Sequence, residues 1–129
     1  MGKYLCLLSM LLALNVNAKQ EFAVDGSFLL EHCGKYVSYL DSGDEKEISK
    51  NIFSISYCQG FIEATRQVSE QMQIFITDEK LKSCIPSSVR NDQLARVLVK
   101  SLRENPDWLH KSAGVNAWAS FVNAYPCLD

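Results

Sequence analysis

Residues 45–72 read EKEISKNIFSISYCQGFIEATRQVSEQM, the longest stretch of the chain with a helical pattern of apolar residues. Steps of three and four residues predict one helix from about Glu45 to Met72. Its broad apolar face favours a central helix packed on more than one neighbour. The residues of this face are Ile48, Ile52, Ile55, Cys58, Phe61, Ile62, Thr65, Val68 and Met72. Gly60 lies within this helix and lowers its stability by roughly 1 kcal/mol relative to alanine. We expect this glycine to permit the close approach of another helix; the alternative is a tolerated defect.

The same spacing predicts three shorter helices around this one. The first runs from about Ser27 to Leu40 and the third from about Asn91 to Glu104, while the fourth follows Ser112 as its N-cap. Their expected buried residues are Leu29, Leu30, Cys33, Tyr36, Val37 and Leu40 in the first, Leu94, Val97, Leu98 and Leu102 in the third, and Val115, Trp118, Ala119 and Val122 in the fourth. Residues 73–89 read as irregular. The predicted fold is an all-α compact bundle of four main helices stapled by two disulfides, with an irregular segment between helices two and three.

The N-terminus has the three-part layout of an export signal. Lys3 precedes a short apolar run, and small residues end at Ala18, where we expect cleavage. The apolar run is shorter than the roughly 20 residues that a membrane-spanning helix needs. Residues 1–18 are therefore predicted to be a cleaved signal peptide and residues 19–129 a single helical domain outside the cytoplasm, with no membrane segment after cleavage.

Four cysteines remain after cleavage, and an even number in a small exported domain predicts two disulfides. Short connections make consecutive helices antiparallel neighbours, so Cys33 and Cys58 are expected to face each other across the first hairpin. Cys84 precedes the third helix and Cys127 follows the fourth, so these two ends should also meet. Cys33–Cys58 and Cys84–Cys127 are therefore the preferred pairs, and the other two connectivities stay open.

Composition and charge bear on the classes of partner. The chain has a formal net charge of −2 and no basic patch to neutralise phosphates, which argues against nucleic acid as a partner. The acidic residues at positions 41–47 read as a solvated loop and helix N-terminus rather than a metal site. No metal or other cofactor is therefore expected.

No catalytic constellation stands out in the sequence. With all four cysteines expected in disulfides, no free thiolate remains as a nucleophile. His32 and His110 read as surface or packing residues, and no GxSxG, HExxH or phosphate-loop motif is present. The sequence thus favours a binding protein over an enzyme.

Several short motifs in order resemble the Rap/Tai family of immunity proteins, which act against type VI secretion amidase effectors. They are Tyr57-Cys58-Gln59-Gly60-Phe61, Cys84-Ile85-Pro86, Gln93-Leu94, Asn105-Pro106 and Tyr125-Pro126-Cys127. The resemblance covers most of residues 27–127. The sequence departs from the family pattern at Arg90, where the family often has a threonine helix cap, so Asn91 is expected to cap the third helix instead. Asn105 and Tyr125 replace a frequent histidine and phenylalanine.

The resemblance implies a periplasmic protein that binds a peptidoglycan amidase effector and blocks its active site, and it implies a homodimer. The motif residues themselves read as structural, so binding residues are expected in exposed loops. The candidates are Asp44, Glu45 and Glu47 in the loop at 41–47, and Phe75, Ile76 and Lys80 in the segment at 73–83. Phe75 and Ile76 are either exposed anchors or core residues, and Lys80 is either a contact or simply solvated.

Two other functions are compatible with the same features. A periplasmic chaperone-like or structural protein without a toxin partner has the same small, helical, disulfide-bearing plan. A small hydrolase with an unrecognised site is the third reading, and it would digest peptidoglycan by itself.

Overall fold

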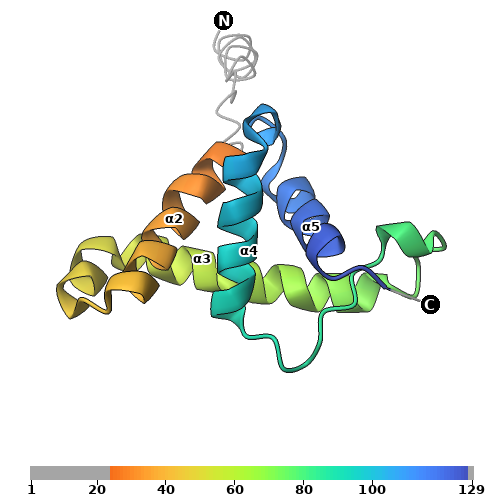
Figure 1. Ribbon diagram of the computed structural model, residues 1–129, viewed down its shortest axis with the longest axis horizontal. Helices are drawn as coiled ribbons and strands as arrows, with labels where there is room; N and C mark the ends of the chain where they lie inside the picture. Colours follow the sequence, from red (N-terminus) through yellow and green to blue (C-terminus); the bar gives the residue numbers. More distant parts are fainter. Residues whose placement is uncertain (1–23, 128–129) are drawn as a thin grey trace, which may run out of the picture.

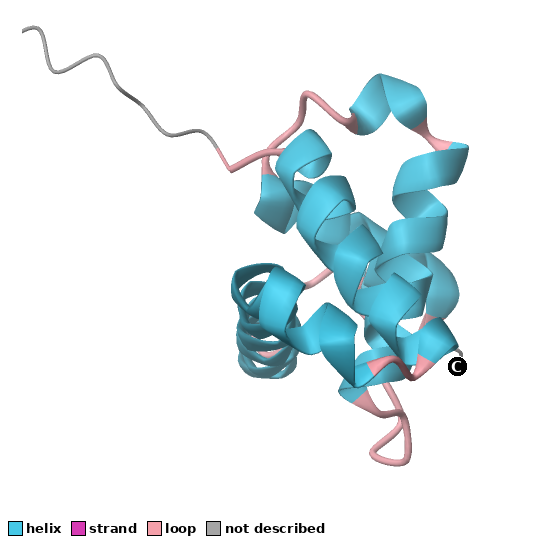
Figure 2. Cartoon of the chain, turned by 90° about the vertical axis from the view of Figure 1, so that its left-hand side faces the viewer, coloured by secondary structure: helices cyan, strands magenta, loops and turns pink. Residues whose placement is uncertain are grey.

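The computed structural model describes residues 24–127, so the predicted signal peptide and its cleavage site lie outside the described residues. Four α-helices carry the fold: α2 (Gly26–Ser42), α3 (Glu45–Met72), α4 (Asn91–Glu104) and α5 (Ala113–Ala124). Two short 3₁₀ helices, η2 (Glu79–Leu81) and η3 (Pro106–Trp108), lie in the connections. Between residues 24 and 127 the chain forms helices and loops and no strand, as Figure 2 shows. The predicted all-α bundle is confirmed.

The helices are arranged with α3 as a long base and the other three standing across it (Figure 1). α4 lies in the middle of the bundle and contacts α2, α3 and α5. Its buried residues are Leu94, Ala95, Leu98, Val99 and Leu102. These residues form the middle of the core, and α3 also contacts α2, α4 and α5, so the predicted packing of the long helix on more than one neighbour is confirmed.

Local sequence explains where the first two helices begin and end. The Asp25 carboxylate caps α2 by accepting from Phe28 N at 2.9 Å. Gly43 ends α2 in the left-handed region (φ 63°), a conformation that costs glycine little, and its N–H donates to Tyr39 O. Asp44 then caps α3 by accepting from Lys46 N at 2.9 Å. The C-cap Gly43 and the N-cap Asp44 thus form the turn between α2 and α3.

α3 departs from the prediction in three ways. The backbone is non-helical at Asn51 (φ −119°, ψ 20°), so the helix kinks near its start. Part of the predicted buried face is exposed, with Ile52 at 55% and Val68 at 59%. A Cβ added at Gly60 would meet nothing within 4 Å, so the expectation that this glycine lets another helix of the same chain approach is wrong.

The buried face of α5 also differs from the predicted one. Val115 is 47% exposed, and Trp118, Ala119 and Val122 are only half-buried. The face that enters the core consists of Ala113, Asn116, Ala117, Ser120 and Phe121. The inward face thus combines three small side chains, a buried asparagine and Phe121, so side-chain hydrophobicity alone did not decide the orientation of α5.

A buried asparagine, which the sequence did not single out, fixes the connection into α5. Asn116 is 2% exposed and its Nδ2 donates to Trp108 O at 3.1 Å and Lys111 O at 3.0 Å. A Cβ at Gly26 would lie 2.7 Å from the same Nδ2, so only glycine fits at the start of α2 here. Gly26 N also donates to Lys111 O at 3.0 Å and Ala113 N to Val24 O at 2.9 Å, and these bonds hold the starts of α2 and α5 together.

Both preferred disulfides are present. Cys33–Cys58 joins α2 to α3, and Cys84–Cys127 joins the segment after η2 to the end of α5. They close loops with sequence separations of 25 and 43 residues. In the chain-entropy model each contributes about 3–4 kcal/mol to stability.

Candidate partner-binding surface

The two regions predicted to bind a partner lie at opposite ends of α3 (Figure 1). Asp44, Glu45 and Glu47 stand at its beginning, where Asp44 serves as the helix cap. Phe75, Ile76 and Lys80 follow its end. A helix of 28 residues is about 42 Å long, so one protomer does not bring the two regions into one site.

The segment at 73–83 exposes two large apolar residues side by side. Ile74 is 81% exposed and Phe75 71%, the highest values among the large apolar residues of the described chain. Ile76, by contrast, is half-buried and turns toward α3 and α5, where it lines a groove. From the sequence, Phe75 and Ile76 were the expected apolar pair. Ile74 was not expected, because its position next to Phe75 was its only indication.

This segment is anchored at both of its ends. Phe75 N and Ile76 N both donate to Met72 O, at 2.9 and 3.2 Å, which continues the turn at the end of α3. The Gln73 side chain donates to Ser83 O across the base of the segment. Cys84 N donates to Tyr125 O at 2.8 Å beside the Cys84–Cys127 disulfide. The exposed pair therefore sits on a tethered base, which limits the entropy lost on binding a partner.

An apolar groove of about 500 Å³ lies between the second half of α3 and the start of α5. It is lined by Phe61, Ala64, Thr65, Val68, Ser69, Met72, Ile76, Gly114 and Trp118. None of these lining residues is charged. The groove follows from the unpredicted rotation of α5, which leaves Trp118 half-buried at its rim.

Aromatic rings cluster along α2 and the first half of α3. Tyr57 contacts Phe28 edge-on at 5.1 Å and stacks on Phe53 and Phe61 at 6.0 and 6.1 Å. Partial burial there raises the pKa of the Tyr57 hydroxyl above its ordinary value. His32, 8% exposed, lies beneath the cluster with its Nδ1 2.8 Å from Ser54 Oγ. His32 is thus a packing residue with one polar partner.

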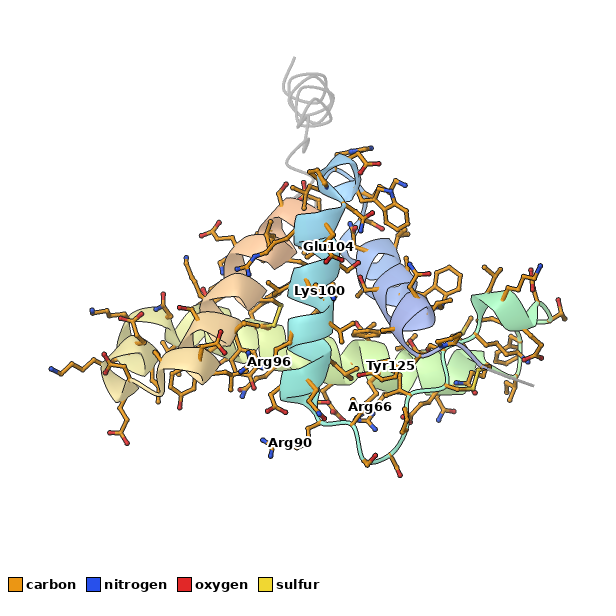
Figure 3. All side chains as sticks on the ribbon, in the orientation of Figure 1. Arg66, Arg90, Arg96, Lys100, Glu104 and Tyr125 are labelled. Atoms are coloured by element: carbon orange, nitrogen blue, oxygen red, sulfur yellow. A yellow bond between two sulfur atoms is a disulfide. The ribbon has the colours of Figure 1, made fainter. Side chains whose placement is uncertain are left out.

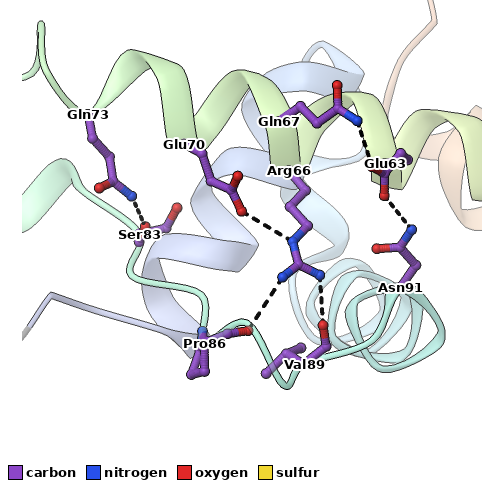
Figure 4. A network of polar contacts seen from close by, with 9 residues as sticks. All are labelled: Glu63, Arg66, Gln67, Glu70, Gln73, Ser83, Pro86, Val89 and Asn91. Atoms are coloured by element: carbon purple, nitrogen blue, oxygen red, sulfur yellow. Dashed lines mark hydrogen bonds and ion pairs between the residues drawn. The ribbon is translucent and has the colours of Figure 1, made fainter.

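A polar network on the opposite flank of α3 holds the loop that leads into α4 (Figure 4). The Arg66 guanidinium donates to Val89 O at 2.7 Å and Pro86 O at 3.5 Å. Asn91, expected to cap α4, instead donates to Glu63 at 2.7 Å, and Arg90 occupies the N-cap. Hydrogen bonds from Asn91 and then Gln67 lower the pKa of the Glu63 carboxyl. These contacts hold the loop before α4 against α3.

The outward side of α4 is charged, with Arg96, Lys100 and Glu104 in one row (Figure 3). Arg96 pairs with Asp41 at the end of α2, and Lys100 with Glu104 at 3.9 Å. Such exposed pairs contribute at most about 1 kcal/mol. In residues 24–127 no three histidine, cysteine or acidic residues group as a metal site would require. None of the described helices has the length and apolarity that crossing a membrane takes.

Comparison with known proteins gives one match. The model of a family described as Rap1a immunity proteins matches residues 25–127, which is most of the chain and nearly all of its described part. Neither the curated proteins nor the solved structures contain a match to this chain. The matched region includes all four helices and both disulfides.

Proposed function

Because the chain belongs to the Rap1a family of immunity proteins, we propose that it protects its producing cell by binding and inhibiting a peptidoglycan amidase delivered by a type VI secretion system. Immunity to a secreted effector is what the family implies. The amidase target is the finer proposal, and it rests on the motif resemblance to the Rap/Tai group. Inhibition is by binding, since an immunity protein of this kind blocks its effector and does not turn over a substrate.

We place this activity in the periplasm, after cleavage of residues 1–18. Two disulfides are typical of proteins that fold in an oxidising compartment, and peptidoglycan is there as well. The mass of the protein recovered from a periplasmic fraction tests the location and the cleavage together. We expect a chain that begins at Lys19; a full-length chain in the cytoplasm would contradict both.

The single observation that carries the binding proposal is the exposed pair Ile74 and Phe75 on its tethered segment. Large apolar side chains at 81% and 71% exposure add nothing to the core of the protomer. Their burial in a partner is favourable, and aromatic anchors are common hot spots of protein interfaces. A projecting apolar segment also suits the concave substrate cleft of a hydrolase.

Co-expression tests the function directly. An amidase encoded beside this gene, directed to the periplasm, should lyse the cells, and this protein should rescue them. Purified, the two proteins should form a one-to-one complex that no longer digests peptidoglycan. If no neighbouring effector is neutralised and denatured client proteins are bound in a pH-dependent manner, the chaperone-like alternative is correct instead.

A pair of matched substitutions tests the surface. Replacing Ile74 and Phe75 by alanine should weaken amidase binding by roughly 30-fold or more, which corresponds to the ~2 kcal/mol of a hot spot. Ile52→Ala is the control, because this residue is also apolar and exposed (55%) but lies near the other end of α3. Calorimetric titration provides the dissociation constants. Equal losses in both variants would remove the 73–83 segment from the interface.

Contacts of the effector with the other candidate residues stay predictions. The same calorimetric titration tests each of them. Charge reversal at Asp44, Glu45, Glu47 and Lys80 should lower affinity only where the effector touches that end of the molecule. We also propose that the protein acts as a homodimer, as its resemblance to the Rap/Tai group implies.

A further inference from the structure

The Cys84–Cys127 disulfide is the covalent link that holds the 73–83 segment against the bundle. It joins the residue after this segment to the residues that follow α5. Between residues 73 and 90, Ser83 alone is fully buried. The segment therefore has almost no apolar core of its own, and its position depends on the disulfide and a few hydrogen bonds.

We propose that Cys84–Cys127 is a thiol–disulfide exchange site, which a protein dithiol of the CxxC type reduces and a disulfide oxidant restores. Oxidation fastens the 73–83 segment in its binding position, and reduction releases the segment and lowers the affinity for the effector. The inference rests on the proposed function, because it concerns the regulation of the surface that would bind the effector. Cys33–Cys58 takes no part in the exchange and keeps the helices together.

Access to sulfur separates the two disulfides. Cys33 and Cys58 are both 0% exposed, whereas Cys84 is exposed and Cys127 half-buried. Cys127 also lines a hollow of about 600 Å³ between η2 and the end of α5. Because a thiolate must reach a sulfur atom in order to attack it, Cys84–Cys127 is open to a second protein and Cys33–Cys58 is not.

The charges around this hollow do not oppose an anionic thiolate. Asp78, Glu79 and Lys80 all line its wall. Asp78 is engaged as the cap of η2, where its carboxylate accepts from Lys80 N at 3.0 Å. Glu79 pairs with Lys82 at 2.5 Å. Two carboxylates and two ammonium groups therefore balance beside the disulfide, and an attacking thiolate meets no excess of negative charge.

The exchange balances as a two-electron step. A thiolate of the reducing protein bonds to the exposed Cys84 sulfur, and the bond to Cys127 breaks; its electron pair leaves with Cys127, which takes up a proton. The second thiolate of the reducing protein then attacks the mixed disulfide and releases Cys84, which is also protonated. Two electrons and two protons thus pass to this protein, and the CxxC pair becomes a disulfide.

The effect of reduction is confined to one part of the chain. Every fully buried apolar residue of the described chain lies before residue 63 or after residue 93. Arg66 donates to Pro86 O and Val89 O, so the loop stays fixed at its α4 end (Figure 4). The stretch that reduction releases is therefore 73–85. Local opening without global unfolding is expected where few apolar contacts are buried.

Few other bonds hold the released stretch in place. The Gln73 side chain donates to Ser83 O, which closes the base of the segment on itself. Cys84 N donates to Tyr125 O at 2.8 Å, and this hydrogen bond is all that the backbone of Cys84 contributes toward α5. A partner that binds the freed segment must first order it, and this loss of entropy lowers the affinity.

Treatment with a reduced CxxC oxidoreductase tests the site. The purified protein is incubated with the oxidoreductase, free thiols are alkylated, and peptide masses identify the reduced pair. Chymotrypsin then reports the state of the segment by its rate of cleavage after Phe75. We expect alkylation of Cys84 and Cys127 alone, cleavage at least tenfold faster, and unchanged helix content by circular dichroism. Calorimetric titration with the amidase should show at least tenfold weaker binding.

A variant with both Cys84→Ser and Cys127→Ser is the matched control, because it lacks the disulfide and bears no alkyl group. It should be cleaved after Phe75 as fast as the reduced wild-type protein, and the oxidoreductase should not change that rate. Its affinity for the amidase should equal that of the reduced and alkylated protein.

The contrary outcomes are distinct. Reduction of Cys33–Cys58 under the same conditions, or loss of helix content with the first reduced pair, would overturn the exchange site. An unchanged rate of cleavage after Phe75 would mean that the segment is held without the disulfide, and an unchanged affinity that exchange does not regulate binding. If the oxidised protein binds no amidase, the proposed function fails, while alkylation and proteolysis still decide whether reduction releases the segment.

Discussion

At the scale of single residues, Arg66 is the side chain outside the core whose removal should lower the free energy of unfolding most. Its guanidinium is bound to two backbone carbonyls of the loop before α4, and its side chain is only 17% exposed. Hydrogen bonds from a charged donor contribute about 1.5–3 kcal/mol, so Arg66→Ala should lower the free energy of unfolding by about that amount. Urea denaturation measures the loss. Glu70→Ala, which removes only the exposed ion pair of Arg66, should cost less than about 1 kcal/mol.

A substitution at Gly60 should instead raise the free energy of unfolding. It lies within α3 with a negative φ, and an added Cβ would contact nothing within the protomer. Gly60→Ala should therefore raise the stability of the protomer by about 0.5–1 kcal/mol, because alanine loses less conformational entropy in a helix. A higher midpoint of thermal unfolding is the expected result. A lower one would mean that the glycine avoids a contact that the isolated protomer does not contain.

At the scale of elements, the two disulfides should differ in how they respond to a reductant. Cys33 and Cys58 are fully buried, whereas Cys84 is exposed and Cys127 half-buried. Mild dithiol treatment should therefore reduce Cys84–Cys127 first, since thiol–disulfide exchange requires access to a sulfur atom. Alkylation followed by peptide mass mapping identifies the reduced pair. Early reduction of Cys33–Cys58 would contradict the burial seen here.

Replacing each pair by serine should separate their roles. Without Cys84–Cys127 the 73–83 segment loses its anchor to the end of α5, so effector binding should weaken more than helix content. Without Cys33–Cys58 the covalent link between α2 and α3 in the core is lost, so the whole fold should become less stable, by about 3 kcal/mol. Circular dichroism during urea denaturation, beside titration with the effector, measures both effects.

The helices themselves were largely predictable, and their orientation was not. Periodicity located α2 and α4 because each presents one clear apolar stripe that enters the core, as Leu29 and Leu98 do. It failed for α5, where Ala117 and Ser120 enter the core and Val115 stays outside. Periodicity records which side of a helix is apolar. It does not record how closely a neighbour approaches.

At the scale of the whole molecule, the candidate site was predictable only in part. The sequence indicated residues 73–83 because they are irregular and contain apolar residues. It did not tell whether Phe75 enters the core, since an apolar residue in a loop is compatible with either position. Only the tertiary structure separates the exposed Phe75 from the half-buried Ile76 one residue later. The separation of the two ends of α3, by contrast, follows from the predicted helix Glu45–Met72, since 28 residues at 1.5 Å each extend over about 42 Å.

The connectivity of the two disulfides has a consequence for how the chain matures. In the proposed export to the periplasm, the chain would leave its translocation pore from the N-terminus onward, so Cys33 and Cys58 would reach the oxidants together on the first helical hairpin before Cys84. Once they have joined, only two thiols are left, and Cys84 has a single possible mate when Cys127 arrives. Four cysteines admit three connectivities. We therefore expect the order of emergence in the proposed export to favour the native connectivity, in which neighbouring cysteines along the first hairpin pair first.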